Sequence, residues 1–124
     1  MIKKLAAIML CLSLVGCVSM SGYEKVQYEK LQAELYRTGL PELKEKDPAM
    51  AGVLNLLPGF GNVYLEQWGP FVGNLLFWPI SIVWGVPQAV IDSNTINKQR
   101  TLSYYTYGLG KKSLIEKGGT LPTE

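Results

Sequence analysis

Apolar and polar residues alternate in long blocks along this chain of 124 residues. A short apolar run comes first, a polar segment follows, a second apolar block begins after Asp47, and the end of the chain is polar again. Between Asp47 and Asp92 the only charged residue is Glu66. This pattern predicts a small, single-domain, mainly α-helical, membrane-anchored protein in which an apolar helical hairpin is flanked by two amphipathic helices. The expected segments are a signal peptide over 1–16, a tether over 17–22, an amphipathic helix with a charged connector over 23–47, the hairpin over 48–92, and a polar helix with a flexible tail over 93–124.

The first polar segment predicts a helix over 23–38 that ends at Gly39, before Pro41. Its apolar residues share one face at i, i+3 and i+7 spacing: Tyr28, Leu31 and Leu35. The favoured interpretation is that this stripe packs on the rest of the domain, because isolated helices of this length are marginally stable. The alternative is a helix that contacts a partner or a membrane surface. The charged connector over 40–47 is expected to form a solvated turn of helix.

The second apolar block begins with a helix-start signal, since Asp47 is a good N-cap and Pro48 a good first residue. Its last part, 71–91, has no charge and as one helix would be about 31 Å long, the thickness of a hydrocarbon core. Pro79 and Pro87 instead favour a kinked or broken helix. A single span, a spanning or interfacial hairpin and the core of a periplasmic domain all remain open.

Small residues in this block mark places where two helices could approach closely. Gly69 and Gly73 form a GxxxG pattern, and Gly52, Gly59 and Gly61 are further small sites. A glycine at a turn explains Gly69 equally well.

The amino-terminal residues have the pattern of an export signal. Lys3 and Lys4 precede an apolar run over 5–15, which is shorter than the roughly 20 residues of a membrane span. The run ends in Leu-Val-Gly16-Cys17, and this stretch resembles the lipobox of bacterial lipoprotein signal peptides. The resemblance implies cleavage between Gly16 and Cys17, with a diacylglycerol and a further acyl chain such as palmitate on Cys17. Three chains exceed the two signals that stable anchoring needs. The alternatives are an ordinary secretory signal or a buried apolar helix.

A second resemblance covers roughly 49–92. It rests on the stretch Gly59-Phe-Gly-Asn-Val-Tyr-Leu65 and on Trp68, Gly73, Asn74-Leu75-Leu76, Trp84-Gly85 and Asp92. These residues resemble the hairpin family named for its two transmembrane helices, in which a glycine-rich break leads into a Tyr-Leu pair, a turn and a second helix that ends in an acidic residue. This chain departs from that pattern at Glu66, in its short first helix and at its prolines. The resemblance implies a membrane-embedded hairpin and no defined biochemistry.

The carboxyl-terminal residues predict a polar helix after Asp92 and then a flexible tail over 111–124. Three tyrosines lie between the two: Tyr104, Tyr105 and Tyr107. They could form an interfacial aromatic belt or be ordinary half-buried tyrosines.

Composition excludes several function classes. Removing Lys3 and Lys4 with the signal lowers the formal net charge from +2 to near zero, so we expect no nucleic-acid partner. The chain has no histidine. Cys11 would be lost with the signal and Cys17 consumed by lipidation, so we expect no disulfide, no Ser-His-Asp or Cys-His catalysis, and no metal or cofactor.

Two function classes remain. The favoured one is a non-enzymatic, structural or partner-binding lipoprotein of the bacterial cell envelope, held to membrane lipid by Cys17 and the hairpin, with an envelope protein or a second copy as partner. The alternative is a membrane-embedded transport or enzyme component that uses Glu66 or Asp92. The periplasmic leaflet of the outer membrane is the favoured location, because Val18 is not the Asp that marks inner-membrane retention in enteric-type lipoproteins. The inner membrane is the alternative, since a long apolar helix tends to be retained there.

Overall fold

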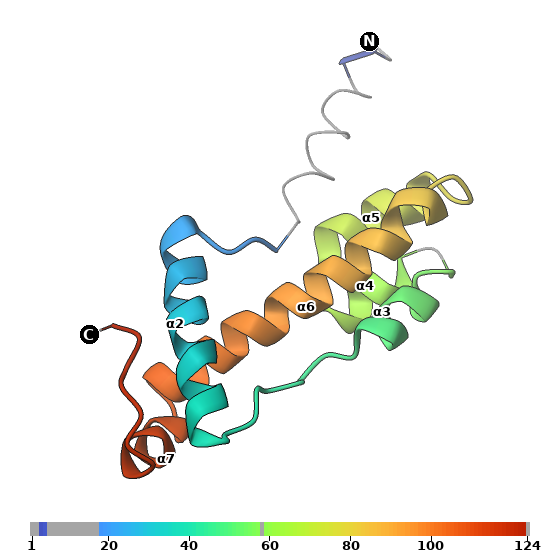
Figure 1. The fold of residues 1–124 in the computed structure, drawn as a ribbon. Helices are drawn as coiled ribbons and strands as arrows, with labels where there is room; N and C mark the ends of the chain where they lie inside the picture. Colours follow the sequence, from blue (N-terminus) through green and yellow to red (C-terminus); the bar gives the residue numbers. More distant parts are fainter. Residues whose placement is uncertain (1–2, 5–17, 58, 124) are drawn as a thin grey trace. The chain divides into compact units, whose positions relative to one another are not determined.

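The computed structural model describes residues 3–4, 18–57 and 59–123, and in these residues all regular structure is helical (Figure 1). The helices are α2 (Gly22–Thr38), α3 (Pro48–Leu54), α4 (Phe60–Tyr64), α5 (Trp68–Leu76), α6 (Ile82–Thr106) and α7 (Gly110–Glu116). The predicted mainly α-helical class is therefore confirmed. Searched across the described residues, the helices include none with the length and apolar character needed to cross a membrane. Gly16 and Cys17, the predicted cleavage and lipidation site, lie outside the described residues.

The described residues form two compact units where the sequence suggested a single domain. The first, which we call the apolar unit, comprises Lys46–Asn94 together with Val18, and so contains α3, α4, α5 and the first half of α6. The second, which we call the polar unit, comprises Ser19–Glu45 and Thr95–Glu124, and so contains α2, the second half of α6 and α7.

Local signals explain the start and end of two helices. Asp47 caps α3 as expected, because its Oδ1 accepts hydrogen bonds from the backbone N–H groups of Ala49 at 2.8 Å and Met50 at 3.1 Å. Helix α2 ends at Gly39, whose φ of 69° is the left-handed conformation that glycine adopts without a Cβ clash. Its start is fixed by a capping box between Ser21 and Glu24.

The expected two-helix hairpin over 48–92 is divided further in the structure. Helices α3 and α4 replace its first arm, and the uncharged run over 71–91 is split into α5 and α6 by turns at 77–81. This break includes Pro79, which cannot donate a backbone hydrogen bond. Pro87 is instead tolerated within α6, which continues past Asp92 to Thr106. The run is therefore not one continuous helix.

Glycines allow close helix contacts within the apolar unit, but at Gly52 and Gly61 rather than at Gly69. A Cβ on Gly52 would lie 3.0 Å from Val90 Cγ2 of α6. A Cβ on Gly61 would collide with the carbonyl oxygen of Ala51 and lie 2.8 Å from Asn55 Cβ. No atom lies within 4 Å of a Cβ on Gly69. The small sites at Gly52 and Gly61 are therefore confirmed as helix contacts.

We expect Gly61→Ala to destabilise the apolar unit by about 1–3 kcal/mol, the usual cost of overpacking, because the colliding Ala51 oxygen belongs to the backbone and cannot rotate away. Gly69→Ala is the matched control and should leave stability unchanged or slightly raised. Denaturant unfolding followed by tryptophan fluorescence measures both, since Trp68, Trp78 and Trp84 all lie in this unit. Equal midpoints for the two variants would contradict the close contact of α3 and α4.

The polar unit has an ordinary apolar core. The buried residues are Met20, Tyr28, Leu31, Leu35, Leu102, Tyr105 and Leu114, with Leu40, Tyr104 and Leu121 packed against them. The expected α2 stripe of Tyr28, Leu31 and Leu35 thus faces the core. The phenol of Tyr105 donates a hydrogen bond of 2.7 Å to the carbonyl of Pro41, so this tyrosine is a core residue, whereas Tyr107 is exposed.

Two expectations for polar segments were wrong. The connector over 40–47 was expected to form a helical turn, but it has no regular secondary structure, and Thr101 Oγ1 of α6 accepts a hydrogen bond from the Leu43 N–H at 3.0 Å. The segment 111–124 was expected to be a flexible tail, but it contains most of α7. Leu114 is fully buried in the core, and this contact holds α7 in place.

Candidate functional site

The interior of the apolar unit is unusually polar. Its buried polar side chains come from α3, α4, α5, α6 and the turns between them: Asn55, Asn62, Gln67, Asn74, Ser81, Asp92 and Ser93. The described hydrophobic residues that are buried to the same degree in this unit are Ala51, Leu65 and Ala89. A soluble domain normally has the opposite arrangement.

Side-chain hydrogen bonds join four of these polar residues and the indole of Trp84 into one chain. Trp84 Nε1 donates to Asn74 Oδ1 at 2.9 Å, and Asn74 Nδ2 donates to Asn62 Oδ1 at 2.6 Å. Asn62 Nδ2 donates to Gln67 Oε1 at 3.1 Å, and Gln67 Nε2 donates to Asp92 Oδ2 at 2.8 Å. This chain, which we call the amide network, ties α4 and α5 to both ends of the α6 segment in the apolar unit. Its amide groups are therefore satisfied inside the unit rather than by solvent.

Asp92 is the acidic end of the amide network. Besides Gln67, its carboxylate accepts hydrogen bonds from the backbone N–H of Val18 and from the side chain of Gln88. Burial raises the pKa of Asp92 above its usual value, although these three donors each act in the opposite direction. Three donors on one buried carboxylate indicate a structural group that fixes the end of the network.

Asn55 lies beside the amide network without joining it. Its side chain is buried, and neither its Nδ2 nor its Oδ1 has a hydrogen-bond partner among the described residues. The Asn55 side chain lies against Gly85 of α6, where an added Cβ would be 2.7 Å from Asn55 Nδ2 and 3.1 Å from Asn74 Nδ2. Gly85 therefore gives two amide groups room to lie against the α6 backbone.

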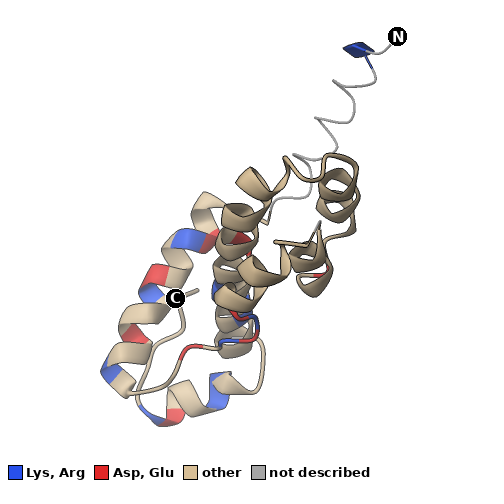
Figure 2. Cartoon of the chain, turned by 90° about the vertical axis from the view of Figure 1, so that its right-hand side faces the viewer, with Lys and Arg blue, Asp and Glu red and all other residues tan. Residues whose placement is uncertain are grey.

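The exterior of the apolar unit is covered by large hydrophobic side chains. The exposed ones are Met50, Val53, Leu56, Leu57, Phe60, Trp68, Val72, Leu75, Leu76, Phe77, Trp78, Ile80, Val83, Trp84 and Ile91. Val83, for example, retains 78% of its accessible surface. Few charged residues interrupt this surface, as the mostly tan helices in Figure 2 show. Apolar surface of this extent marks a site of contact with lipid or with another protein.

Charged groups gather at one end of the apolar unit. Lys46 Nζ lies 3.2 Å from Glu66 Oε1, donates to the Tyr64 carbonyl at 3.0 Å and lies over the Tyr64 ring at 5.1 Å. The carbonyl of Lys46 accepts a 3.2 Å hydrogen bond from Ser93 Oγ, beside Asp92. We call this group the charged rim. The α5 and α6 segments both run from it to the turns at 77–81.

The two carboxylates singled out from the sequence have different surroundings. Glu66 is exposed and pairs with Lys46, whereas Asp92 is buried in the amide network. In the part of the chain that the structure describes, Glu66 pairs with Lys46, whereas Asp92 accepts from Gln67, Gln88 and Val18, so the two carboxylates are held by different groups and do not form a catalytic pair. The described residues also contain no group of three or more His, Cys, Asp or Glu side chains that could hold a metal ion.

The sequence reasoning missed most of the amide network, because it singled out only Asp92 among these residues as a candidate functional group. A signal was present in their spacing, because polar residues recur at seven-residue intervals: Asn55 with Asn62, and Gln67 with Asn74, Ser81 and Gln88. Residues seven apart lie on the same face of a helix. In the structure these residues lie on separate helices and turns, and all but Gln88 are buried, while the large apolar side chains lie outside.

Comparisons with known proteins found no matching protein family, no matching curated protein and no matching solved structure. The site must therefore be interpreted from its own geometry and chemistry.

Proposed function

We propose that this protein is a lipid-anchored component of the bacterial cell envelope whose apolar unit inserts into one leaflet of a membrane and holds the polar unit at the surface. The observation that carries the proposal is that the apolar unit has polar amide side chains inside and large hydrophobic side chains outside, the opposite of a soluble domain. In a bilayer, polar groups must be satisfied within the protein, and the amide network does this. The acyl chains expected on Cys17 would supply the second attachment.

The dimensions of the apolar unit favour one leaflet. From Ile82 to Asp92, α6 rises about 15 Å, half of a hydrocarbon core of about 30 Å. Trp78 and Ile80 are exposed at the far end, in the turns that join α5 to α6. When the charged rim remains at the headgroups, the turns that join α5 to α6 therefore lie near the bilayer midplane.

The charged rim has the composition of a membrane–water interface. Lys46, Tyr64 and Glu66 form it, and Trp68 follows directly in the sequence with its ring exposed. Tyrosine and tryptophan are enriched at headgroup level, and lysine and glutamate there remain hydrated. The proposed depth therefore leaves the charges of the rim in water.

The proposed molecular role is structural or partner-binding. Glu66 is neutralised by Lys46, and Asp92 is engaged by three donors, which supports a structural role over the transport or enzyme alternative. The outer membrane remains the favoured location on the identity of Val18. A partner protein would bind the polar unit, which carries the charged residues of α2 and α7.

Depth-dependent quenching of tryptophan tests the insertion. The full-length protein, purified from cells, is reconstituted into vesicles that carry bromine either near the headgroup or near the end of the acyl chains. Two single-tryptophan variants are compared: Trp68→Phe with Trp84→Phe leaves Trp78, and Trp78→Phe with Trp84→Phe leaves Trp68. We expect deep bromine to quench Trp78 most strongly and shallow bromine to quench Trp68 most strongly, because Trp78 lies in the α5–α6 turns and Trp68 beside the charged rim.

Both variants lose the same Trp84 hydrogen bond, so they are matched for any loss of stability. No quenching of either tryptophan at any bromine depth would contradict insertion of the apolar unit. Mass spectrometry of the same preparation tests the anchor separately: the acyl mass should be present on Cys17 and absent after Cys17→Ser.

A further inference from the structure

Glu66, in the charged rim, has a backbone conformation that glutamate rarely adopts. Its φ of 63° lies in the left-handed region, and among the described residues it is the non-glycine residue with a positive φ. A Cβ disfavours this conformation by roughly fivefold to thirtyfold. Glycine avoids this cost. The presence of glutamate here must therefore be explained by what its side chain does.

The turn after α4 determines this conformation. The Gln67 N–H donates to the Asn62 carbonyl at 2.8 Å, and the Glu66 N–H donates to the Val63 carbonyl at 2.9 Å. These are the two hydrogen bonds of a Schellman motif, in which the residue at position 66 is left-handed and is usually glycine. The side chains of Asn62 and Gln67 are also joined in the amide network. The turn thus imposes the left-handed conformation on whichever residue stands at position 66.

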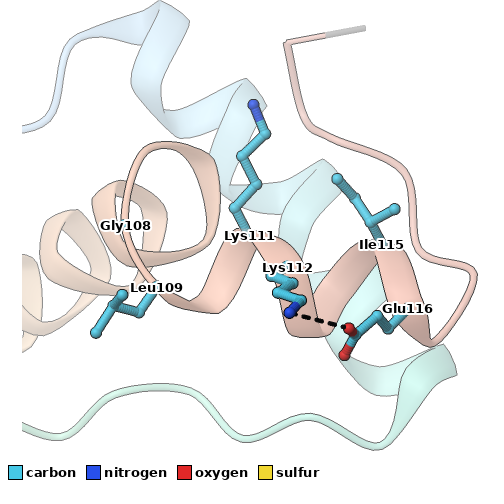
Figure 3. Close-up of a pocket in the computed structure, with 6 residues that line it drawn as sticks. All are labelled: Gly108, Leu109, Lys111, Lys112, Ile115 and Glu116. Carbon is cyan, nitrogen blue, oxygen red and sulfur yellow. Dashed lines mark ion pairs between the residues drawn. The ribbon is translucent and has the colours of Figure 1, made fainter.

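The ion pair with Lys46 does not offset this cost. Glu66 Oε1 lies 3.2 Å from Lys46 Nζ, but the Glu66 side chain is 75% exposed, and exposed pairs contribute little to stability. The Lys46 ammonium is also held by the carbonyl and ring of Tyr64. An ordinary exposed pair, Lys112 with Glu116, lies beside an open hollow of about 540 Å³ on α7, and neither of its residues is left-handed (Figure 3). Stability alone therefore does not explain Glu66.

We propose that the Glu66 carboxylate binds the ammonium group of ethanolamine headgroups in the membrane. A carboxylate offers about four acceptor sites on its two oxygens, and Lys46 contacts Oε1. A primary ammonium has three N–H donors and forms charge-assisted hydrogen bonds with a carboxylate, whereas the quaternary ammonium of a choline headgroup has no N–H donor. This inference rests on the proposed function, which places the charged rim at the headgroups.

Quenching of Trp68 by brominated lipid tests this contact, because Trp68 is close to Glu66 in the sequence and its ring is 66% exposed. The full-length single-tryptophan protein that retains Trp68 is reconstituted in equimolar ethanolamine and choline phospholipids. In one preparation only the ethanolamine lipid carries bromine near the headgroup, and in the other only the choline lipid does. The ratio of the two quenching efficiencies measures the lipid composition beside Trp68.

We expect the ethanolamine lipid to be enriched beside Trp68 by about twofold to fivefold, the range of an exposed ion pair. Glu66→Gly and Glu66→Gln should each abolish the enrichment, because both remove the charge. Glu66→Gly should also unfold at no lower a denaturant concentration than the parent, since glycine relieves the left-handed strain. Loss of enrichment in that variant then cannot result from unfolding. Glu116→Gln, which breaks the ordinary ion pair of α7, is the matched control and should keep the enrichment.

Equal quenching by the two lipids in the parent, or enrichment that survives Glu66→Gly, would overturn the proposal. So would a Glu66→Gly protein less stable than the parent, because the ion pair alone would then account for the glutamate. Enrichment of the choline lipid would also overturn it, and would identify the exposed Trp68 ring as the group that recognises the headgroup. Quenching by deep bromine of the protein that retains Trp78 shows whether the apolar unit is inserted. Failure of the headgroup contact is therefore distinguishable from failure of the proposed function.

Discussion

Replacing Asn62 with leucine is expected to destabilise the apolar unit by about 2–6 kcal/mol. Asn62 is fully buried and is the central member of the amide network. Its loss leaves Gln67 Oε1 and Asn74 Nδ2 buried without their partner, and each orphaned group costs about 1–3 kcal/mol. Leucine cannot replace either hydrogen bond, although it fits the apolar character of the surrounding sequence.

Asn94→Leu is the control for the same chemical change at an exposed position of the apolar unit, where a surface substitution should stay within about 0.5 kcal/mol of the parent. Tryptophan fluorescence during denaturation of the protein in a mild detergent reports this unit, which contains all three tryptophans. If the two variants have the same free energy of unfolding, the prediction is wrong. The buried hydrogen bonds of Asn62 would then contribute nothing to the stability of the apolar unit.

Helix boundaries that depend only on residues adjacent in the sequence were predicted correctly. Gly39 and Asp47–Pro48 act through backbone conformation and capping, which need no tertiary contact, and the structure confirms both. The stripe of Tyr28, Leu31 and Leu35 was predicted to face a core for a similar reason, since a single helix determines which residues share its face.

The amide network could not be derived in this way. Whether Asn74 and Ser81 face outward or inward depends on where α5 ends and how α6 folds back, and the turns at 77–81 set both. Hydrophobicity rules for soluble proteins place asparagine outside and leucine inside, so they give the wrong orientation for Asn62 and for exposed residues such as Leu76. The seven-residue spacing of the polar side chains indicates a shared face but not the direction in which that face points.

The grouping into two units was missed because it joins segments far apart in the sequence. Arg37 Nη2 donates to the Gly118 carbonyl at 2.6 Å, and Glu34 Oε2 accepts from the Thr120 N–H at 3.0 Å. The hydrogen bond from the Arg37 side chain, together with that from Thr120, lowers the pKa of Glu34. Glu34 also forms an ion pair with Arg37 one turn further along α2, at 2.6 Å. These contacts hold 118–120 on α2, where a flexible tail was expected.

Leu31→Ala is expected to destabilise the polar unit by about 2–5 kcal/mol, the usual cost of truncating a fully buried leucine. Leu31 lies in the core formed by α2, α6 and α7, so its removal leaves a cavity that the flanking Leu35 and Leu114 cannot fill without moving. The exposed Tyr36 lies on the same helix, and Tyr36→Ala controls for changes in helix propensity.

Far-ultraviolet circular dichroism follows the loss of helix in both units, whereas tryptophan fluorescence follows the apolar unit alone. For Leu31→Ala we expect part of the circular dichroism transition to move to lower denaturant concentration while the fluorescence midpoint stays in place. A shift of both signals by the same amount would mean that the units unfold together, and the polar unit would then have no stability of its own. A separate shift would show that the polar unit has an independent core, as a module held at a membrane surface by another part of the chain requires.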